Sequence, residues 1–147
     1  MGGTGGGPNQ IVQGPGFVAI LQEADNDRRI IPTDGRSQGN IRGWRGESVG
    51  RWEGDTLVVE TTGLKESIDQ PTAHGENARI VERYTPRTVG GVRRLPLTLT
   101  IHDPEFYTAP PTVTREYTQL QVGRMLDYDC NEPDWEDHLE SLRQKKK

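Results

Sequence analysis

The chain has 147 residues, a length that fits one domain with a single hydrophobic core. Its composition is 31% hydrophobic and rich in turn formers, with Gly 18 and Pro 10, which favours an all-β fold over a helical bundle. A formal net charge of -4 argues against nucleic acid as a partner, and no stretch approaches the roughly 18 apolar residues of a membrane span.

The first segment, residues 1–10, is rich in glycine and is expected to be a flexible leader. It has neither the basic region nor the apolar region of a signal peptide. We expect residues 11–147 to form one domain. The single cysteine, Cys130, excludes an internal disulfide and says little about the compartment.

Residues 11–23 predict two short strands around a Gly-Pro-Gly turn. Alternation places one set of side chains of the second strand on a common face, which we expect to be buried; the set is Phe17, Ala19, Leu21 and, at its end, Glu23. Residues 28–36, "RRIIPTDGR", predict another short strand that ends at Pro32.

Residues 37–50 predict a long polar loop that carries Trp44. The next segment, "GRWEGDTLVVETT" at residues 50–62, predicts a β-hairpin in which Gly54 takes a positive φ. Alternation leaves Glu60 as the only plausible inward polar group of this hairpin.

The second half of the chain predicts further strands at residues 78–85, 92–104 and 112–120, with a turn at 86–91. In the long strand, one face is an apolar stripe that ends in phase with Asp103; it consists of Leu95, Leu97, Leu99 and Ile101. Residues 122–130 predict a last strand, which would form a hairpin with residues 112–120.

Residues 133–143 predict a short C-terminal helix, because Pro133 precedes an acidic first turn and three apolar residues share one face. About eight short strands separated by turns predict a small antiparallel β-barrel, or a sandwich, followed by this helix.

Several strings resemble a family of uncharacterised proteins from soil bacteria, whose motifs include RIIPxDGR and GRWEGDTLVVETT. In this chain they are "RRIIPTDGR" at 28–36, "GRWEGDTLVVETT" at 50–62, "VERYT" at 81–85 and "YDCNE" at 128–132. The resemblance covers most of the span 11–132 and implies a protein that is exported from the cell. It implies no particular activity.

The tripeptide Gly50-Arg51-Trp52 also resembles, more faintly, the Gly-x-Trp that begins a strand in lipocalin-type barrels. This likeness implies a barrel with an interior binding site.

The sequence contains no motif typical of a metal site or of a catalytic nucleophile. His74, His102 and His138 are far apart in the sequence and form no recognised ligand motif, so no metal and no other cofactor is expected, although a weak histidine site stays open. Cys130 lies among acidic residues that disfavour its thiolate, which indicates an inert thiol.

The candidate catalytic groups are Glu23 and Asp103, since both end apolar stripes that are expected to face one interior. Burial would raise the pKa of such carboxyl groups toward values useful for acid/base catalysis. His102 and Tyr128 are candidates for orienting groups. The alternative is that each carboxylate pairs with an arginine at the barrel rim, such as Arg29.

The candidate substrate-binding residues combine a cation, two indoles, a carboxylate and a phenol. They are Arg29, Trp44, Trp52, Glu60 and Tyr84. The structural alternatives are a core tyrosine with a satisfied hydroxyl and a tryptophan that plugs the barrel.

The sequence therefore predicts a small-molecule-binding β-barrel that acts as a cofactor-independent acid/base enzyme, such as a lyase, isomerase or hydrolase. The alternatives are a non-catalytic carbohydrate- or lipid-binding module and a structural protein that assembles through its edge strands, as a homo-oligomer. A small organic ligand is the expected partner, with no nucleic acid and no membrane. We expect a soluble protein and leave its compartment open.

Overall fold

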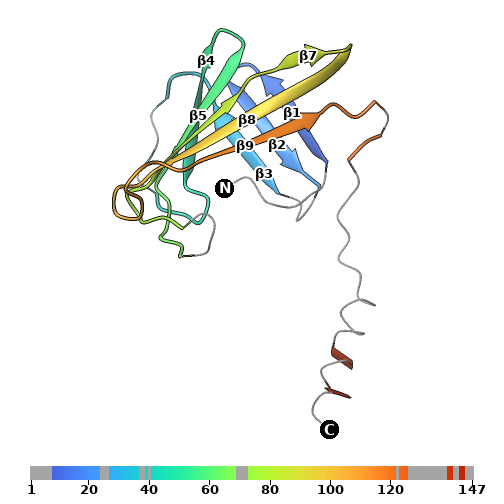
Figure 1. The fold of residues 1–147 in the computed structure, drawn as a ribbon. Helices are drawn as coiled ribbons and strands as arrows, with labels where there is room; N and C mark the ends of the chain where they lie inside the picture. The colour runs from blue at the N-terminus through green and yellow to red at the C-terminus, as the bar shows by residue number, and fades with distance from the viewer. Residues whose placement is uncertain are drawn as a thin grey trace.

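A computed structural model describes residues 8–23, 27–36, 39, 41–68, 73–121, 123–125, 139–140 and 143–144. Within these ranges the fold is all-β, as the composition predicts (Figure 1). The strands are β1 (Asn9–Gly14), β2 (Phe17–Gln22), β3 (Arg28–Pro32), β4 (Glu47–Glu53), β5 (Thr56–Thr62), β6 (Arg79–Tyr84), β7 (Arg87–Val89), β8 (Val92–His102) and β9 (Thr112–Thr118).

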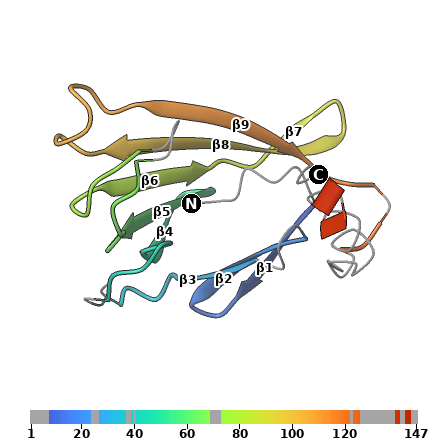
Figure 2. The same ribbon diagram turned by 90° about the horizontal axis from the view of Figure 1, so that it is seen from below.

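The described strands form two antiparallel sheets. The small sheet has the order β1-β2-β3, and the large sheet has the order β4-β5-β6-β8-β7, with β9 paired to β8. The sheets face each other, close together beside β3 and β4 and apart beside β1 and β9 (Figure 2). Because β1 and β9 each pair with one strand only among the described residues, the predicted barrel does not close there.

The predicted hairpin at residues 50–62 is confirmed and begins slightly earlier, at Glu47. Its strands β4 and β5 pair from Glu47 with Thr62 to Glu53 with Thr56, and Gly54 has a φ of 61° in the turn. This positive φ costs glycine nothing but strains residues that carry a Cβ.

The predicted face of β2 is inverted. Val18, which opposes Ile31 of β3, is 2% exposed, whereas Phe17 is 36% exposed on the other face. Phe17 pairs with Gly14 in register, and a Cβ on Gly14 would collide with its ring at 2.4 Å. The ring of Phe17 therefore packs over Gly14 on the outer face of the small sheet. Because this face also carries apolar residues, the sequence pattern alone did not distinguish it from the buried face.

The apolar stripe of β8 faces inward, as predicted. Leu97 and Ile101 are buried, and Leu99 is half-buried. Two core clusters result: one joins the sheets and contains Val18, Ile31, Leu57, Val59, Tyr84 and Leu97, and the other contains Leu64, Ala78, Ile80 and Ile101.

The close approach of the two sheets depends on Gly50 of β4. A Cβ at this position would lie 3.0 Å from Cγ2 of Ile31 and 3.1 Å from Cγ2 of Thr33. A larger residue would push β3 away from β4, so this glycine sets the spacing at the side where the sheets meet.

The predicted turn at 86–91 and the predicted elements at the two ends of the chain have different outcomes. The predicted turn at 86–91 contains the short strand β7. Residues 139–140 and 143–144 are helical, but the rest of the predicted helix at 133–143 lies outside the described residues. Residues 1–7 of the predicted leader at 1–10 and the end of the predicted strand at 126–130 also lie outside them. Asn9 and Gln10 belong to β1, so the leader was predicted too long, and residues 123–125 form no strand.

A helix with the length and apolarity needed to cross a membrane is not found in the described ranges.

Candidate functional site

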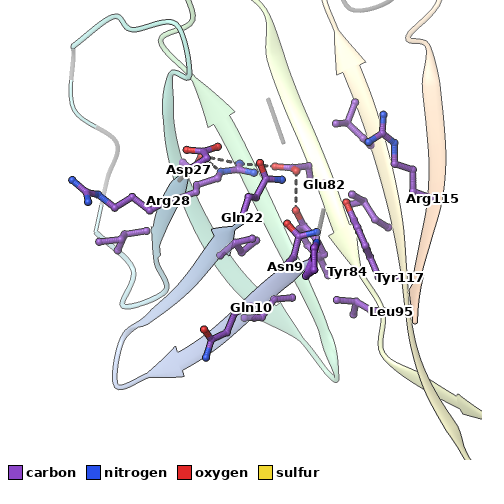
Figure 3. Close-up of a pocket in the computed structure, with 18 of the residues that line it drawn as sticks. Asn9, Gln10, Gln22, Asp27, Arg28, Glu82, Tyr84, Leu95, Arg115 and Tyr117 are labelled. Carbon is purple, nitrogen blue, oxygen red and sulfur yellow. Dashed lines mark hydrogen bonds and ion pairs between the residues drawn. The ribbon is translucent and has the colours of Figure 1, made fainter. Parts of the chain in front are cut away.

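A large cavity lies between the two sheets (Figure 3). Its volume is about 1730 Å³, which exceeds the roughly 300–1,000 Å³ of common ligand pockets. Strands of both sheets contribute apolar side chains to its walls, among them Ile11, Ile20, Leu95, Leu97, Leu99 and Val113. The cavity, which is open to one side, can therefore hold an organic molecule with an extended apolar body.

A buried ion pair crosses this cavity from one sheet to the other. Arg29 of β3 contacts Glu82 of β6 with 2.5 Å between Nη2 and Oε2, and the Glu82 side chain is 2% exposed. The hydroxyl of Tyr84 donates a hydrogen bond of 2.9 Å to the other carboxylate oxygen of Glu82 (Figure 3). Both oxygens of Glu82 thus have partners within the protein.

Two hydroxyl groups complete the surroundings of Arg29. Its guanidinium donates to Oγ of Ser48 at 2.8 Å and to Oγ1 of Thr61 at 2.7 Å, and these hydroxyls lie 2.9 Å apart. Ser48 and Thr61 are cross-strand partners on the inner face of β4 and β5. The alternation of the hairpin thus places both beneath the arginine.

The small sheet adds polar groups to the same region. Asn9 and Gln22 pair in register across β1 and β2 and line the cavity (Figure 3). Asp27, which precedes β3, forms an ion pair with Arg45.

The electrostatics of this cluster fix its charge states. Burial lowers the pKa of Arg29, but the attraction and hydrogen bond of Glu82 outweigh it, so that pKa ends above its usual value. Burial, followed by the negative charge of Glu82, raises the pKa of Tyr84 far above the ordinary 10.0 of a tyrosine. Arg29 is therefore a permanent cation and Tyr84 a permanent neutral donor near neutral pH.

The predicted pairing of Glu23 with Asp103 rests on a register that is wrong for β2. The inner face of β2 carries Val18, Ile20 and Gln22, so Glu23 is not in phase with it, and neither carboxylate is among the residues that line the cavity.

Asp103 has a structural role that its contacts explain. It is 2% exposed and accepts backbone hydrogen bonds from Gly75 at 2.6 Å and Glu105 at 3.0 Å. Its carbonyl also accepts from the amides of Phe106 and Tyr107. A short side-chain acceptor at a strand end commonly organises a turn in this way.

His102 and Glu60 lie on the outer face of the large sheet. His102 pairs in register with Arg79, next to the inward Ile101. Glu60 forms an ion pair of 2.9 Å with Arg79, so the prediction that it points inward is wrong; Thr61 is the inward polar residue of this strand. Tyr128 lies outside the described residues.

The predicted tryptophans, Trp44 and Trp52, make no hydrogen bond to the polar cluster, which consists of the described residues Arg29, Ser48, Thr61, Glu82 and Tyr84. Trp44 is 71% exposed, with Nζ of Lys65 5.2 Å from its ring centroid. Trp52 is 44% exposed and borders a smaller hollow of about 80 Å³, together with Val18 and Leu57. Of the predicted binding residues, the structure brings Arg29 and Tyr84 together in the polar cluster, and Tyr84 also lines the smaller hollow with Trp52.

Sequence reasoning missed Glu82, which is the centre of the cluster. The available signal was its phase: Ile80, Glu82 and Tyr84 alternate along β6, so a carboxylate occupies the same face as a buried isoleucine. An acidic residue in phase with a core stripe indicates a buried ion pair or a site.

The described residues contain no group of three or more histidine, cysteine, aspartate or glutamate side chains placed to hold a metal ion. Three carboxylates in this part of the chain line the cavity, those of Asp27, Glu47 and Glu82; Glu82 is bound by Arg29 and Tyr84, and Asp27 is paired with Arg45.

No protein-family model, curated protein or solved structure matches this chain in the comparisons. The resemblances to the soil-bacterial family and to lipocalin-type barrels therefore stay predictions.

Proposed function

We propose that the protein is a binding module that holds an organic small molecule with a largely apolar body between its two sheets. The observation that carries this proposal is the cavity of about 1730 Å³ with isoleucine, leucine and valine side chains on its walls. Burial of an apolar ligand there would gain roughly 25 cal/mol for each Å² removed from water. The ligand would occupy the space that the interior of a closed β-barrel provides in lipocalin-type proteins.

The hydrogen bonding of the polar cluster supports binding over acid/base catalysis. A general base needs a carboxylate oxygen within reach of the substrate, whereas both oxygens of Glu82 are engaged by Arg29 and Tyr84. The alternative, cofactor-free catalysis, loses its main support because Glu23 and Asp103 do not line the cavity.

The polar cluster would instead hold the shape of the binding site. Arg29 comes from the small sheet and its partners Ser48, Thr61 and Glu82 come from the large sheet, so their contacts tie the two walls together. A pre-formed cavity loses less free energy on binding than one that must be ordered by its ligand.

The test is the binding of N-phenyl-1-naphthylamine, a neutral apolar dye whose fluorescence rises in an apolar site. We expect saturable binding, and the variant Leu99→Trp, which fills part of the cavity, should weaken it at least about tenfold by excluding the dye from its apolar walls. Thr98→Trp is the matched control, because Thr98 is the neighbouring residue on the opposite face of β8 and does not line the cavity.

Failure of the dye to bind, or equal weakening by both tryptophan variants, would contradict the proposal. Turnover of a bound ester, lactone or enolisable ketone by the wild type, lost in Glu82→Gln, would favour the enzymatic alternative instead.

A further inference from the structure

We propose that the ligand is an amphiphile with a single acidic head group, such as a medium- or long-chain carboxylate, and that Arg115 binds this group. This inference rests on the proposed function and adds to it the chemical class of the ligand. It comes from the charges that line the cavity.

Cationic side chains outnumber anionic ones around the cavity. Eight arginines line it, Arg28, Arg29, Arg36, Arg45, Arg93, Arg94, Arg115 and Arg124, and they face three acidic residues, Asp27, Glu47 and Glu82. This excess occurs in a chain whose formal net charge is -4, so positive charge is concentrated at the cavity. Walls of one sign raise the local concentration of a ligand of the opposite sign.

Half of these arginines have carboxylate partners. Arg29 pairs with Glu82, Arg45 with Asp27, Arg36 with Asp34 and Arg94 with Glu116. The other four, Arg28, Arg93, Arg115 and Arg124, have no ion pair with any described residue.

Arg115 has the best position of these four. It lies in the middle of β9 and opposes Leu97 in register, so it belongs to the face that carries the apolar wall. Figure 3 shows its side chain and that of Tyr117 beside the cavity, whereas Arg28 extends away from Tyr117 and Glu82 on the opposite side. An acid group at Arg115 would leave the rest of the ligand against Leu95, Leu97 and Leu99.

Tyr117 provides a second donor next to Arg115. It is two residues further along the same face of β9, it is half-buried, and its hydroxyl has no hydrogen bond to the described residues. A guanidinium can donate two parallel hydrogen bonds to one carboxylate, and a phenol can add a third. A single small acid group fits this arrangement.

The test compares dodecanoate with 1-dodecanol as competitors of N-phenyl-1-naphthylamine, on the full chain near neutral pH. The two probes share the apolar chain and differ in the charge of the head group. We expect the wild type to prefer dodecanoate by about tenfold, the effect of one charge-assisted contact. In Arg115→Gln this preference should disappear while the affinities for 1-dodecanol and the dye stay unchanged.

The matched control is Arg83→Gln, which removes the same charge from the outer face of the large sheet, where Arg83 pairs with Glu53. It should keep the full preference for dodecanoate, and Arg115→Lys should keep part of it. Tyr117→Phe should lower the preference by a smaller factor, about threefold.

Each outcome has a distinct meaning. Equal affinities of the wild type for the two probes, or a preference that survives in Arg115→Gln, would overturn the role of Arg115 and leave the proposed function standing. Failure of the wild type to bind the dye and both probes would overturn the proposed function itself.

A measurement on the wild type alone gives an independent check. Raising the salt concentration from about 50 mM to about 500 mM should reduce the preference for dodecanoate, because ions screen a partly exposed charge pair. A preference that is insensitive to salt would contradict recognition by an arginine.

Discussion

The two faces of the large sheet use the same chemical pair, arginine with glutamate, in opposite surroundings. On the inner face, Glu82 is 2% exposed and its partner Arg29 comes from the other sheet. On the outer face, Glu60 pairs with Arg79 of the neighbouring strand, with side chains that are 31% and 43% exposed. The comparison teaches that burial and connectivity, rather than the number of pairs, decide what an ion pair does for the fold.

The outer face of the large sheet carries a network of exposed arginine–glutamate ion pairs. Glu53 lies between Arg83 and Arg51, and its hydrogen bond with Arg83 is the main reason why its pKa is lowered. At the strand end where Arg94 also borders the cavity, contacts with Arg94 and then Arg87 lower the pKa of Glu116 in the same way. Solvent surrounds these groups and screens their attraction.

Glu82→Gln breaks the inner pair and should have the largest effect. The amide still accepts hydrogen bonds, but Arg29, whose side chain is 20% exposed, is left facing the buried position without a counter-charge, which costs about 3–5 kcal/mol of unfolding free energy. Urea unfolding followed by tryptophan fluorescence measures the loss. A loss below about 1 kcal/mol would mean that water solvates the pair in the cavity.

The double variant Arg29→Met/Glu82→Leu sharpens this result. Because it removes both charges together, it should be more stable than Glu82→Gln alone. If the double variant is the less stable of the two, the contacts of Arg29 with Ser48 and Thr61 matter more than its charge.

Tyr84→Phe removes the hydroxyl that donates to Glu82 and should have the next largest effect. The loss of a hydrogen bond to a charged group costs about 1.5–3 kcal/mol, since the apolar ring of Tyr84 keeps its place in the core. The unfolding free energy near neutral pH checks this. An unchanged value would place a water or another donor at the vacant oxygen of Glu82.

The raised pKa of Tyr84 predicts how stability depends on alkaline pH. The folded protein holds this proton more tightly than the unfolded chain, so the contribution of the group is complete below the ordinary pKa of 10.0 and is lost as the pH rises above it. Between about pH 10 and pH 11 the wild type should lose about 1 kcal/mol more than Tyr84→Phe. Parallel stability curves for the two proteins in this range would contradict the burial of the phenol.

Glu60→Gln tests the outer face and should have the smallest effect. An exposed pair contributes about 0–1 kcal/mol, and salt should reduce even that. A loss above about 2 kcal/mol would remove the difference between the two faces.

The fold was largely predictable, because local patterns specify it. Alternation and turn residues located the hairpin around Gly54 and the inward stripe that ends at Ile101. The face of β2 was not predictable by the same rule. Both of its faces carry apolar residues, and only the contact of Val18 with the large sheet decides which one is buried.

The candidate site was predicted less well, since its contacts connect residues that are far apart in sequence. Arg29 and Tyr84 were identified as polar or aromatic residues in strands, but the sequence does not show that Glu82 lies between them. The error over Asp103 has a similar cause. Its carboxylate accepts a hydrogen bond from the backbone amide of Gly75, 28 residues away, and no periodic pattern in the sequence reveals that contact.

β1 and β9, which lie at the side where the two sheets are apart, differ in the side chains along their edges. β9 carries Arg115 and Glu116, whose charges oppose the addition of another chain, whereas β1, "NQIVQG", has no charge and leaves Ile11 and Val12 46% and 40% exposed. Concentrated solutions of the protein should therefore self-associate by strand addition at β1 rather than at β9. A lysine at Val12 would protect that edge without entering the cavity, because the inward residue of the pair is Ile11.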